Sequence, residues 1–277
     1  MLQQPDAPAM AIIDWMMPEM DGLELVRRVR GLSTDQPPYL IMLTSKGEKA
    51  DIITGLDAGA NDYLGKPFDA GELRARVKVG FRMVEMQMAL IESREALAHQ
   101  ASHDPLTGMF NRRAILDHLH QQLAHADRHG LALAVAICDI DHFKQINDTH
   151  GHQTGDDILC GLATILKENL RQDDTVGRMG GEEFLIISTM RAATDRFALF
   201  DRIRRLIAET AIATRSGSLH ITLSIGAALA VTGSTVDTLL ERSDLALYQA
   251  KNDGRNRVVL GPEPTASANK HYEAGQT

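Results

Sequence analysis

The chain has 277 residues and a formal net charge of −8, which is enough length for two domains and too acidic for a nucleic-acid surface. The only cysteines are Cys138 and Cys160, no apolar run reaches the roughly 20 residues that span a bilayer, and the amino terminus lacks the features of a signal peptide. These features predict a cytoplasmic protein that binds neither nucleic acid nor membrane, and in which a nucleotide substrate needs a local cationic site or a metal.

Short apolar runs at residues 10–14 and 39–45 end in polar residues and alternate with helix-like stretches. That alternation predicts a parallel α/β domain. Residues 69–101 contain no proline and predict one helix of roughly 50 Å, at about 1.5 Å per residue. Its apolar residues recur at spacings of three and four, as in a coiled coil. They are Val77, Phe81, Val84, Met88, Ile91 and Ala98. Glu95 interrupts this seam, so a single amphipathic connector helix is the alternative.

A second α/β region begins near His103. Its pattern predicts helices at 111–126, 155–170, 193–210 and 236–252, strands at 131–139, 220–226 and 257–260, and a hairpin around Gly180 and Gly181. The order strand, helix, hairpin, helix, strand is typical of a ferredoxin-like or polymerase-palm domain with a central antiparallel sheet. The last residues, 262–277, are rich in Pro, Ala, Ser and Gly and are predicted to be a disordered tail.

Three carboxylates lie at strand ends of this second region. Asp139 closes a buried strand, and Glu182 and Glu183 follow a Gly-Gly turn between two apolar segments. In a palm-like sheet these places are neighbours, and converging carboxylates hold Mg²⁺ for phosphoryl chemistry. An ordinary glycine-turn hairpin with solvated acids is the alternative, and these residues alone do not decide between the two.

Four motifs in chain order resemble those of GGDEF-domain diguanylate cyclases. Arg178-Met-Gly-Gly-Glu-Glu-Phe184 is similar to the signature motif of that family, and the run Asp139-Ile-Asp-His-Phe-Lys-Gln-Ile-Asn-Asp-Thr-His-Gly-His-Gln-Thr-Gly-Asp156 to its upstream motif. Asp104-Pro-Leu-Thr-Gly108 with Asn111-Arg112-Arg113 resembles the opening motif, and Tyr248-Gln-Ala-Lys251 with Gly254-Arg255-Asn256 the closing one. The resemblance covers about residues 102–261 and implies an enzyme that condenses two GTP into cyclic di-GMP and two pyrophosphates.

The resemblance also implies a metal site of two Mg²⁺ ions for each GTP, with Mn²⁺ as an alternative. Asp139 and Glu182 would bind the metal pair, with the Ile140 carbonyl and Glu183 as further ligands. Glu182 or a metal-bound hydroxide would deprotonate the attacking hydroxyl.

Other matched residues would bind the nucleotide. The Gly180 and Gly181 backbone would admit the phosphates, because neither residue has a Cβ. Asn147 and Asp156 would bind guanine, since an ionised Asp accepts from both N1–H and N2–H, which favours GTP over ATP. Cations would neutralise the triphosphate and the departing pyrophosphate, although each is alternatively a solvated surface residue. They are Lys144, Lys251 and Arg255. Phe143 and His152 match substrate-site positions, but Phe143 is better interpreted as core and His152 as a loop-shaping residue.

Arg171-Gln-Asp-Asp174 precedes Gly180 at the spacing of the family's Arg-x-x-Asp product-inhibition site, and Arg202 resembles an arginine contributed by a neighbouring domain. A charged turn is the alternative. Each domain would supply half an active site, so the resemblance implies a homodimer inhibited by cyclic di-GMP. A catalytically silent cyclic di-GMP receptor is a second hypothesis, which the intact signature motif disfavours. A palm-type polymerase or cyclase for another nucleotide is a third, which the guanine-binding pair disfavours.

The amino-terminal region resembles response-regulator receivers. Asp14-Trp-Met-Met-Pro-Glu-Met-Asp-Gly22, Leu43-Thr44-Ser45 and Gly65-Lys66-Pro67-Phe68 are similar to the phosphoacceptor, switch-threonine and lysine motifs, and Tyr63 matches the switch aromatic. The resemblance implies a flavodoxin-like sheet, Asp14 as phosphoacceptor and a cognate histidine kinase as partner. No counterpart of the family's first two strands and acidic pair precedes Asp14. We therefore expect residues 1–82 to be a truncated receiver with slow or absent phosphorylation, either shortened or degenerate and serving dimerisation, joined by a helical linker at 83–101.

Overall fold

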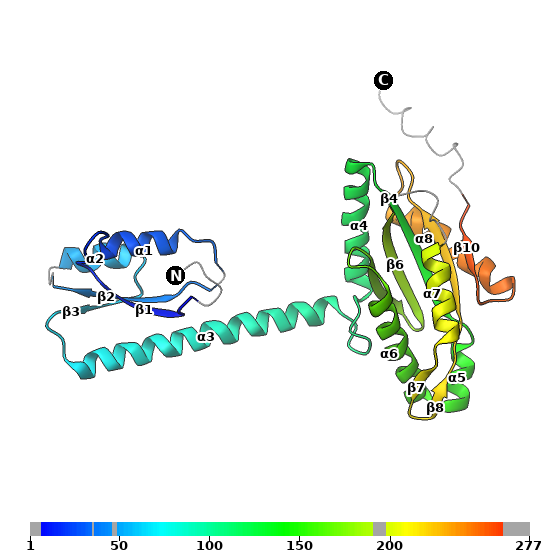
Figure 1. The fold of residues 1–277 in the computed structure, drawn as a ribbon, viewed down its shortest axis with the longest axis horizontal. Helices are drawn as coiled ribbons and strands as arrows, with labels where there is room; N and C mark the ends of the chain where they lie inside the picture. The colour runs from blue at the N-terminus through cyan, green and yellow to red at the C-terminus, as the bar shows by residue number, and fades with distance from the viewer. Residues whose placement is uncertain (1–6, 35, 46–48, 191–197, 263–277) are drawn as a thin grey trace, which may run out of the picture. The chain divides into compact units, whose positions relative to one another are not determined.

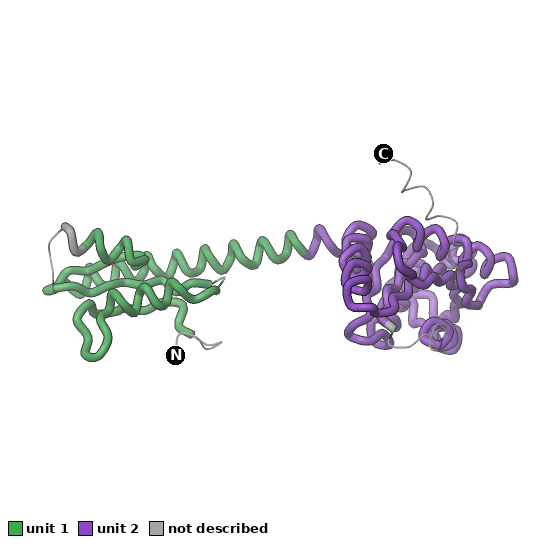
Figure 2. The backbone as a smooth tube through the Cα atoms, turned by 90° about the horizontal axis from the view of Figure 1, so that it is seen from above, with its two compact units in different colours: residues 1–98 green, residues 99–277 purple. Residues whose placement is uncertain are grey.

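The computed structural model describes residues 7–34, 36–45, 49–190 and 198–262. The chain forms two compact units, residues 1–98 and 99–277, coloured green and purple in Figure 2. Among the described residues no helix has the length and apolar character needed to cross a membrane. The predicted tail, apart from Pro262, lies outside the described residues.

The first unit contains a parallel sheet of three strands in the order β1 (Met10–Asp14), β2 (Tyr39–Thr44) and β3 (Asp62–Gly65). Helices α1 (Gly22–Arg30) and α2 (Lys49–Asp57) connect the strands, and α3 (Ala70–Ser102) follows them. The apolar core of this unit includes Ile13 of β1 and Val26 of α1, with Leu40 and Met42 of β2 fully buried. The predicted parallel α/β arrangement is confirmed.

Helix α3 has 33 residues and confirms the predicted long helix. Within the predicted apolar seam, Phe81 and Met88 are exposed, whereas Val77, Val84 and Ile91 are half-buried. Val84, Met88 and Ile91 line a cavity of about 560 Å³ together with residues of the 32–38 loop, so this part of the seam faces the first unit. The exposed apolar side chains of α3 include a second seam, two residues out of phase with the predicted one. It consists of Val79, Met83, Met86, Leu90 and Leu97.

The second unit is built on a five-stranded sheet, visible in Figure 1, with the order β10-β9-β4-β6-β5. The strands are β4 (Ala132–Ile140), β5 (Thr175–Gly180), β6 (Glu183–Met190), β9 (Leu223–Leu229) and β10 (Val258–Leu260). Neighbours pair antiparallel except β9 and β10, which are parallel. This is the predicted palm-like arrangement.

Helices cover both faces of this sheet. Helices α4 (Arg112–His129) and α8 (Val236–Asn252) pack on one face, and α6 (His152–Asn169) and α7 (Ala198–Glu209) on the other. A short helix, α5 (Phe143–His150), follows β4, and a small hairpin of β7 (Ile212–Thr214) and β8 (Gly217–Leu219) follows α7.

Strand β4 is the centre of the core because it is buried on both faces. Ala134, Ala136 and Cys138 pack toward α6 and α7, whereas Leu133, Val135 and Ile137 pack toward α4 and α8. Successive side chains of a strand point to opposite faces. Asp139 therefore continues the face that α8 covers, and this places the first predicted site residue beside the end of that helix.

Some sequence predictions were wrong in detail. The strand predicted at 220–226 is β9, which begins at Leu223 and is buried on both faces because helices lie on each side of the sheet. Helix α6 begins at His152, three residues earlier than predicted, and neither α5 nor the β7–β8 hairpin was predicted. The helix predicted at 193–210 falls partly outside the described residues, which place α7 at Ala198–Glu209. Helix α8 has the predicted bounds.

Candidate active site

Two predicted acids meet a predicted cation at the carboxyl end of β4. Asp139 lies opposite Glu183, the first residue of β6, in the β4–β6 pairing. The Asp139 side chain is buried, and its Oδ2 lies 2.7 Å from Nζ of Lys251 in the last turn of α8. Three segments far apart in the sequence thus place two carboxylates and an ammonium group together.

Burial raises the pKa of Asp139, and Glu182 and Asp141 add to the rise, against the opposing effect of Lys251. Burial also raises the pKa of Glu183, with Asp139 as the next contributor. Carboxylates that repel each other in a poorly solvated place are stabilised in their charged form by a nearby cation. These electrostatics indicate a site suited to positive charge.

The described residues contain no group of three His, Cys, Asp or Glu side chains close enough to hold a metal ion. In nucleotide enzymes, however, Mg²⁺ is bound by one or two carboxylates and completes its shell with substrate phosphates and water. Asp139 and Glu183 supply hard oxygen ligands at one place, and Ile140 follows Asp139 directly with its carbonyl. The donor set therefore fits Mg²⁺ held jointly by the chain and a nucleotide.

The turn between β5 and β6 begins with two glycines in conformations that other residues avoid. Gly180 has φ 146° and Gly181 has φ 53°, both positive. A Cβ at either position would meet nothing within 4 Å, so the turn faces open space. The predicted role of this turn, close approach of phosphates to backbone, is compatible with that openness. Glu182 lies at the same turn and is half-buried.

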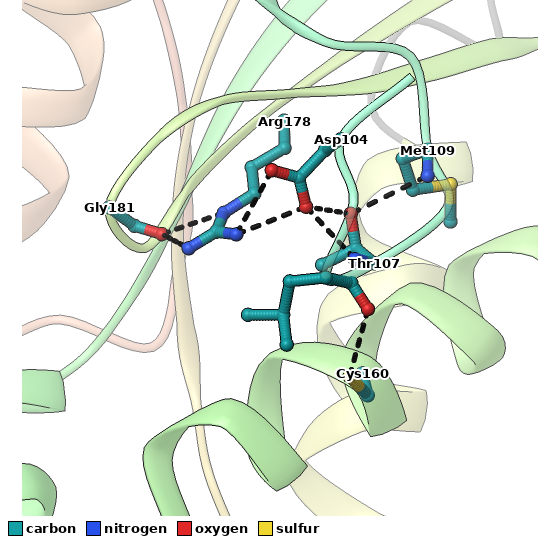
Figure 3. Close-up of polar contacts among 7 residues, drawn as sticks. Asp104, Thr107, Met109, Cys160, Arg178 and Gly181 are labelled. Carbon is teal, nitrogen blue, oxygen red and sulfur yellow. Dashed lines mark hydrogen bonds and ion pairs between the residues drawn. The ribbon is translucent and has the colours of Figure 1, made fainter. Parts of the chain in front are cut away.

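Arg178 fixes this turn to the segment that precedes α4, as Figure 3 shows. Its Nη1 donates to both carboxylate oxygens of Asp104, at 3.0 and 3.2 Å. Its Nε and Nη2 donate to the Gly181 carbonyl at 3.0 and 2.8 Å. Asp104 also accepts from the backbone and hydroxyl of Thr107, and the Cys160 thiol donates to the Leu106 carbonyl at 3.2 Å. The opening motif and the signature motif are therefore one hydrogen-bonded structure.

The predicted guanine-binding residues come together between α5 and α6. Asn147 lies on α5, and Asp156 lies exposed in the second turn of α6. Among the described residues, Oδ1 of Asn147 is buried without a hydrogen-bond partner. A Cβ at Gly155 would lie 1.9 Å from this oxygen, so only glycine admits the amide there. A buried acceptor without a donor is rare in folded proteins and is compatible with a ligand N–H.

Other predicted substrate residues lie around the same helices. His152 is exposed at the start of α6, and Lys144 is exposed on α5. Phe143 is part of the hydrophobic core, as its alternative interpretation held. Arg255 is exposed in the turn after α8.

Sequence reasoning missed Arg215, in the turn between β7 and β8. Its backbone N–H and its Nε both donate to Oδ2 of Asp157 at 2.9 Å, and Nη2 donates to Oδ1 at 3.0 Å. Nη1 donates to Gln153 at 2.6 Å. The pKa of Asp157 is lowered to about 2, first by the side-chain hydrogen bond from Arg215. The hairpin thus holds the first turns of α6, where Asp156 lies, but it was not itself predicted.

Asp141 was also missed. Its buried carboxylate accepts hydrogen bonds from Thr222, Ser224 and the Asn256 backbone, which come from β9 and its approach and from the turn after α8. No pattern near Asp141 in the sequence indicates these partners.

Comparisons with known proteins identify the family. A model described as diguanylate cyclase, GGDEF domain, matches residues 101–257, and a response regulator receiver domain model matches residues 1–78. The chain belongs to the GGDEF-domain diguanylate cyclase family. Response regulator PleD of Caulobacter vibrioides is 35% identical over 254 residues, which cover 90% of this chain and 56% of PleD. Diguanylate cyclase DosC of Escherichia coli is 40% identical over 167 residues, 60% of this chain and 36% of DosC. The chain therefore spans about half or less of these relatives.

Solved structures give the same family. The coiled coil and GGDEF domain of DgcB from Caulobacter crescentus, in complex with c-di-GMP, has 34% identity and a TM-score of 0.61, and the match covers 68% of this chain and 99% of that one. The active GGEEF domain of a diguanylate cyclase from Vibrio cholerae has 35% identity and a TM-score of 0.51, over 56% and 98%.

The predicted product-site residues of this GGDEF domain lie near one another. The Arg171 N–H donates to Oδ2 of Asp174 at 3.0 Å, and the Ser188 hydroxyl donates to Oδ1 at 2.5 Å. Nη2 of Arg202, on α7, donates to the Asn169 carbonyl at 2.8 Å, close to Arg171 in the sequence. The turn holds Asp174 rigidly and leaves the Arg171 side chain exposed.

The predicted phosphoacceptor of the receiver domain, Asp14, ends β1. Its carboxylate pairs with the Lys66 ammonium and accepts from the Met16 N–H at 3.2 Å. The hydrogen bond from Lys66 is the main cause of the lowered pKa of Asp14. Thr44 is buried at the end of β2. The three motif residues thus occupy neighbouring strand ends.

Proposed function

We propose that this chain condenses two GTP molecules into cyclic di-GMP, releasing two pyrophosphates, as an Mg²⁺-dependent homodimer. The observation that carries the proposal is the convergence of Asp139, Glu183 and Lys251 beside the open Gly180–Gly181 turn. In this proposal residues 102–261 are the catalytic domain and 83–101 are the helical linker.

Each domain would bind one GTP through the side chains and backbone groups described above. The Asn147 amide oxygen would accept from the guanine amino group, and Asp156 from the neighbouring ring N–H. Lys144, Lys251 and Arg255 would surround the phosphates, where positive charge stabilises the departing pyrophosphate. Bound Mg²⁺, held by Asp139, the Ile140 carbonyl and the signature carboxylates, would neutralise the phosphates and acidify the attacking hydroxyl.

Two such domains must face each other, because the 3′-hydroxyl of one GTP attacks the α-phosphorus of the other. Catalysis then consists mainly of positioning and electrostatic stabilisation. Glu182, at the signature turn, or a metal-bound hydroxide would accept the hydroxyl proton. Monomers would be nearly inactive.

Product inhibition would act at Arg171 and Asp174, with Arg202 as a further contact. A planar guanidinium suits guanine and phosphate together, and a carboxylate suits the guanine edge. The exposed Arg171 side chain beside a fixed Asp174 supports this role. That DgcB was solved with c-di-GMP supports the same class of ligand. The receiver domain implies a histidine kinase as partner, although we expect phosphorylation of Asp14 to be slow or absent.

The test is product formation from GTP and Mg²⁺ by the full chain, resolved by chromatography at several protein concentrations. We expect cyclic di-GMP to form with more than linear dependence on protein, and to fall by at least about a hundredfold in Asp139→Asn. Asp127→Asn, which alters an exposed carboxylate on α4, is the matched control and keeps the rate. No product at any concentration, together with tight cyclic di-GMP binding, would instead favour the silent receptor.

A further inference from the structure

Asp141 and Asp139 are equally buried, at 5% exposure each, but they have different partners. The Ser224 hydroxyl donates to Oδ1 of Asp141 at 2.6 Å, and the Thr222 hydroxyl donates to Oδ2 at 2.6 Å. The Asn256 backbone N–H donates to Oδ2 at 3.0 Å. The Asp141 N–H in turn donates to the Thr222 carbonyl at 3.0 Å. A buried carboxylate with three donors is a fixed structural anchor.

The Asn256 N–H belongs to a turn with unfavourable backbone conformation. Gly254, Arg255 and Asn256 have φ values of 109°, 65° and 44° in succession. Residues with a Cβ rarely adopt positive φ, so such a turn persists only where its surroundings hold it. Here the Arg255 N–H donates to the Ala250 carbonyl at 3.0 Å, and Nη1 of Arg204 donates to Asn256 Oδ1 at 2.8 Å. Asp141 joins the same turn to β4.

Asp139 and Asp141 therefore contact the two ends of one segment, residues 251–256. Ile140, the last residue of β4, lies between them and packs toward α6 and α7. Asp139 contacts Lys251 at the end of α8, and Asp141, which directly follows β4, contacts the Asn256 backbone. The segment between these contacts carries Arg255, a cation assigned above to the phosphates.

We propose that Asp141 is a positioning residue for nucleotidyl transfer, and that it does not bind the metal. It holds the 254–256 turn against β4 so that the Arg255 guanidinium stays within reach of the triphosphate. The sequence Asp-Ile-Asp resembles a pair of metal ligands, but three donors and 5% exposure leave the second carboxylate committed to the protein. The proposal rests on the proposed function above and adds a role within it.

The experiment measures kcat and KM for GTP in the full chain, for Asp141→Asn, Arg255→Ala and the double variant. If Asp141 acts through Arg255, each single variant lowers kcat by about tenfold or more with little change in KM, because the contact matters most as charge develops on pyrophosphate. The double variant is then no slower than Arg255→Ala alone. Effects of the two single variants that multiply in the double variant would overturn the proposal.

Two controls separate positioning from folding. Thr222→Val removes one donor to the same carboxylate but leaves the Asn256 contact, so kcat stays within about twofold of the wild type. A loss as large as that of Asp141→Asn would overturn the proposal. If Asp141→Asn fails to fold, Arg204→Met loosens the turn from its other side. Arg204→Met is then expected to lower kcat when Arg255 is present and to leave kcat unchanged in the Arg255→Ala variant. An equal loss of kcat in both backgrounds would contradict the proposal.

Metal dependence and proteolysis complete the test. The Mg²⁺ concentration for half-maximal rate is unchanged in Asp141→Asn, and a rise of about tenfold would make Asp141 a metal ligand instead. Trypsin cleaves after Arg255 faster in Asp141→Asn than in the wild type or Thr222→Val, because the turn is released. An unchanged cleavage rate would also contradict the proposal that Asp141 holds the 254–256 turn. A wild-type chain without product refutes the proposed function, whereas an active wild type with independent variants refutes only the role of Asp141.

Discussion

Replacing Arg178 by alanine tests the connection between the opening and signature motifs. The Arg178 and Asp104 side chains are 15% and 19% exposed, so their ion pair is only weakly screened by solvent. The substitution removes four hydrogen bonds and leaves the Asp104 carboxylate and the Gly181 carbonyl without this donor. Breaking a buried pair costs about 3 to 5 kcal/mol, and partial exposure favours the low end. We expect the second unit to lose about 3 kcal/mol of unfolding free energy.

Pairing with Arg178 also makes this contribution depend on pH. Burial acts to raise the pKa of Asp104, but hydrogen bonds from Thr107 and Arg178 outweigh it and hold the pKa below its ordinary value of 3.8. A lowered pKa in the folded state means that the stabilisation is fully present above that ordinary value and is lost as pH falls through the folded value. The difference between wild type and Arg178→Ala should therefore narrow below about pH 4.

The assay is urea unfolding followed by two signals. Trp15 is the only tryptophan and lies in the first unit, so its fluorescence reports that unit, whereas far-ultraviolet circular dichroism reports both. Arg178→Ala should move the dichroism transition of the second unit and leave the Trp15 transition in place. Arg128→Ala, which removes an exposed arginine whose Nε donates to the Ala124 carbonyl, should change stability by less than about 0.5 kcal/mol. An equally small change in Arg178→Ala would refute the reasoning.

Three further predictions concern packing and charge. Gly155→Ala should raise KM for GTP by at least about tenfold while the fold survives, because the new Cβ would lie 1.9 Å from Asn147 Oδ1 and displace it; steady-state kinetics measure this. Gly226→Ala should prevent folding of the second unit, since its Cβ would lie 2.1 Å from the backbone of α8; dichroism at low temperature would show the loss. The Asp157–Arg215 pair should stabilise the chain above pH 3.8 and lose its effect as pH falls toward about 2, so the acid unfolding midpoint of Arg215→Met should shift upward.

The parts of the fold that were predictable have strong local signals. The uninterrupted apolar run before Asp139 predicts a buried strand, and the structure places β4 there with both faces covered. The Gly-Gly pair predicts the hairpin because its backbone conformation requires glycine. Helix α8 was predicted with its bounds, and its amino terminus is capped by Thr235 and Thr238. In each case the determining interactions lie within a few residues.

The parts that could not be predicted depend on distant partners. Arg215 meets Asp157 across 58 residues, and the hairpin that presents it has strands of only three residues. Helix α5 begins after His142, whose backbone is in the left-handed conformation and whose side chain does not cap the helix, so the sequence has no capping signal there. The coiled-coil seam of α3 stays a prediction, because Val84 and Ile91 line a cavity within the first unit whereas Phe81 and Met88 of the same seam are exposed. Helical spacing alone does not say which neighbour an apolar stripe meets.

Asp139 and Asp141 show where motif reading reaches its limit. They are the same residue type, two positions apart at the end of β4 and equally buried, so neither spacing nor hydrophobic pattern separates their roles. Their partners do. Asp139 contacts an ammonium that a metal–nucleotide complex can replace, whereas Asp141 accepts from two hydroxyls and a backbone N–H, the last from 115 residues away. If a cation took the place of these three donors at Asp141, the two hydroxyls and the backbone N–H would lose their hydrogen-bond acceptor. In the proposed enzyme, Asp139 is therefore the carboxylate that would bind the metal ion, whereas Asp141 stays bound to the protein.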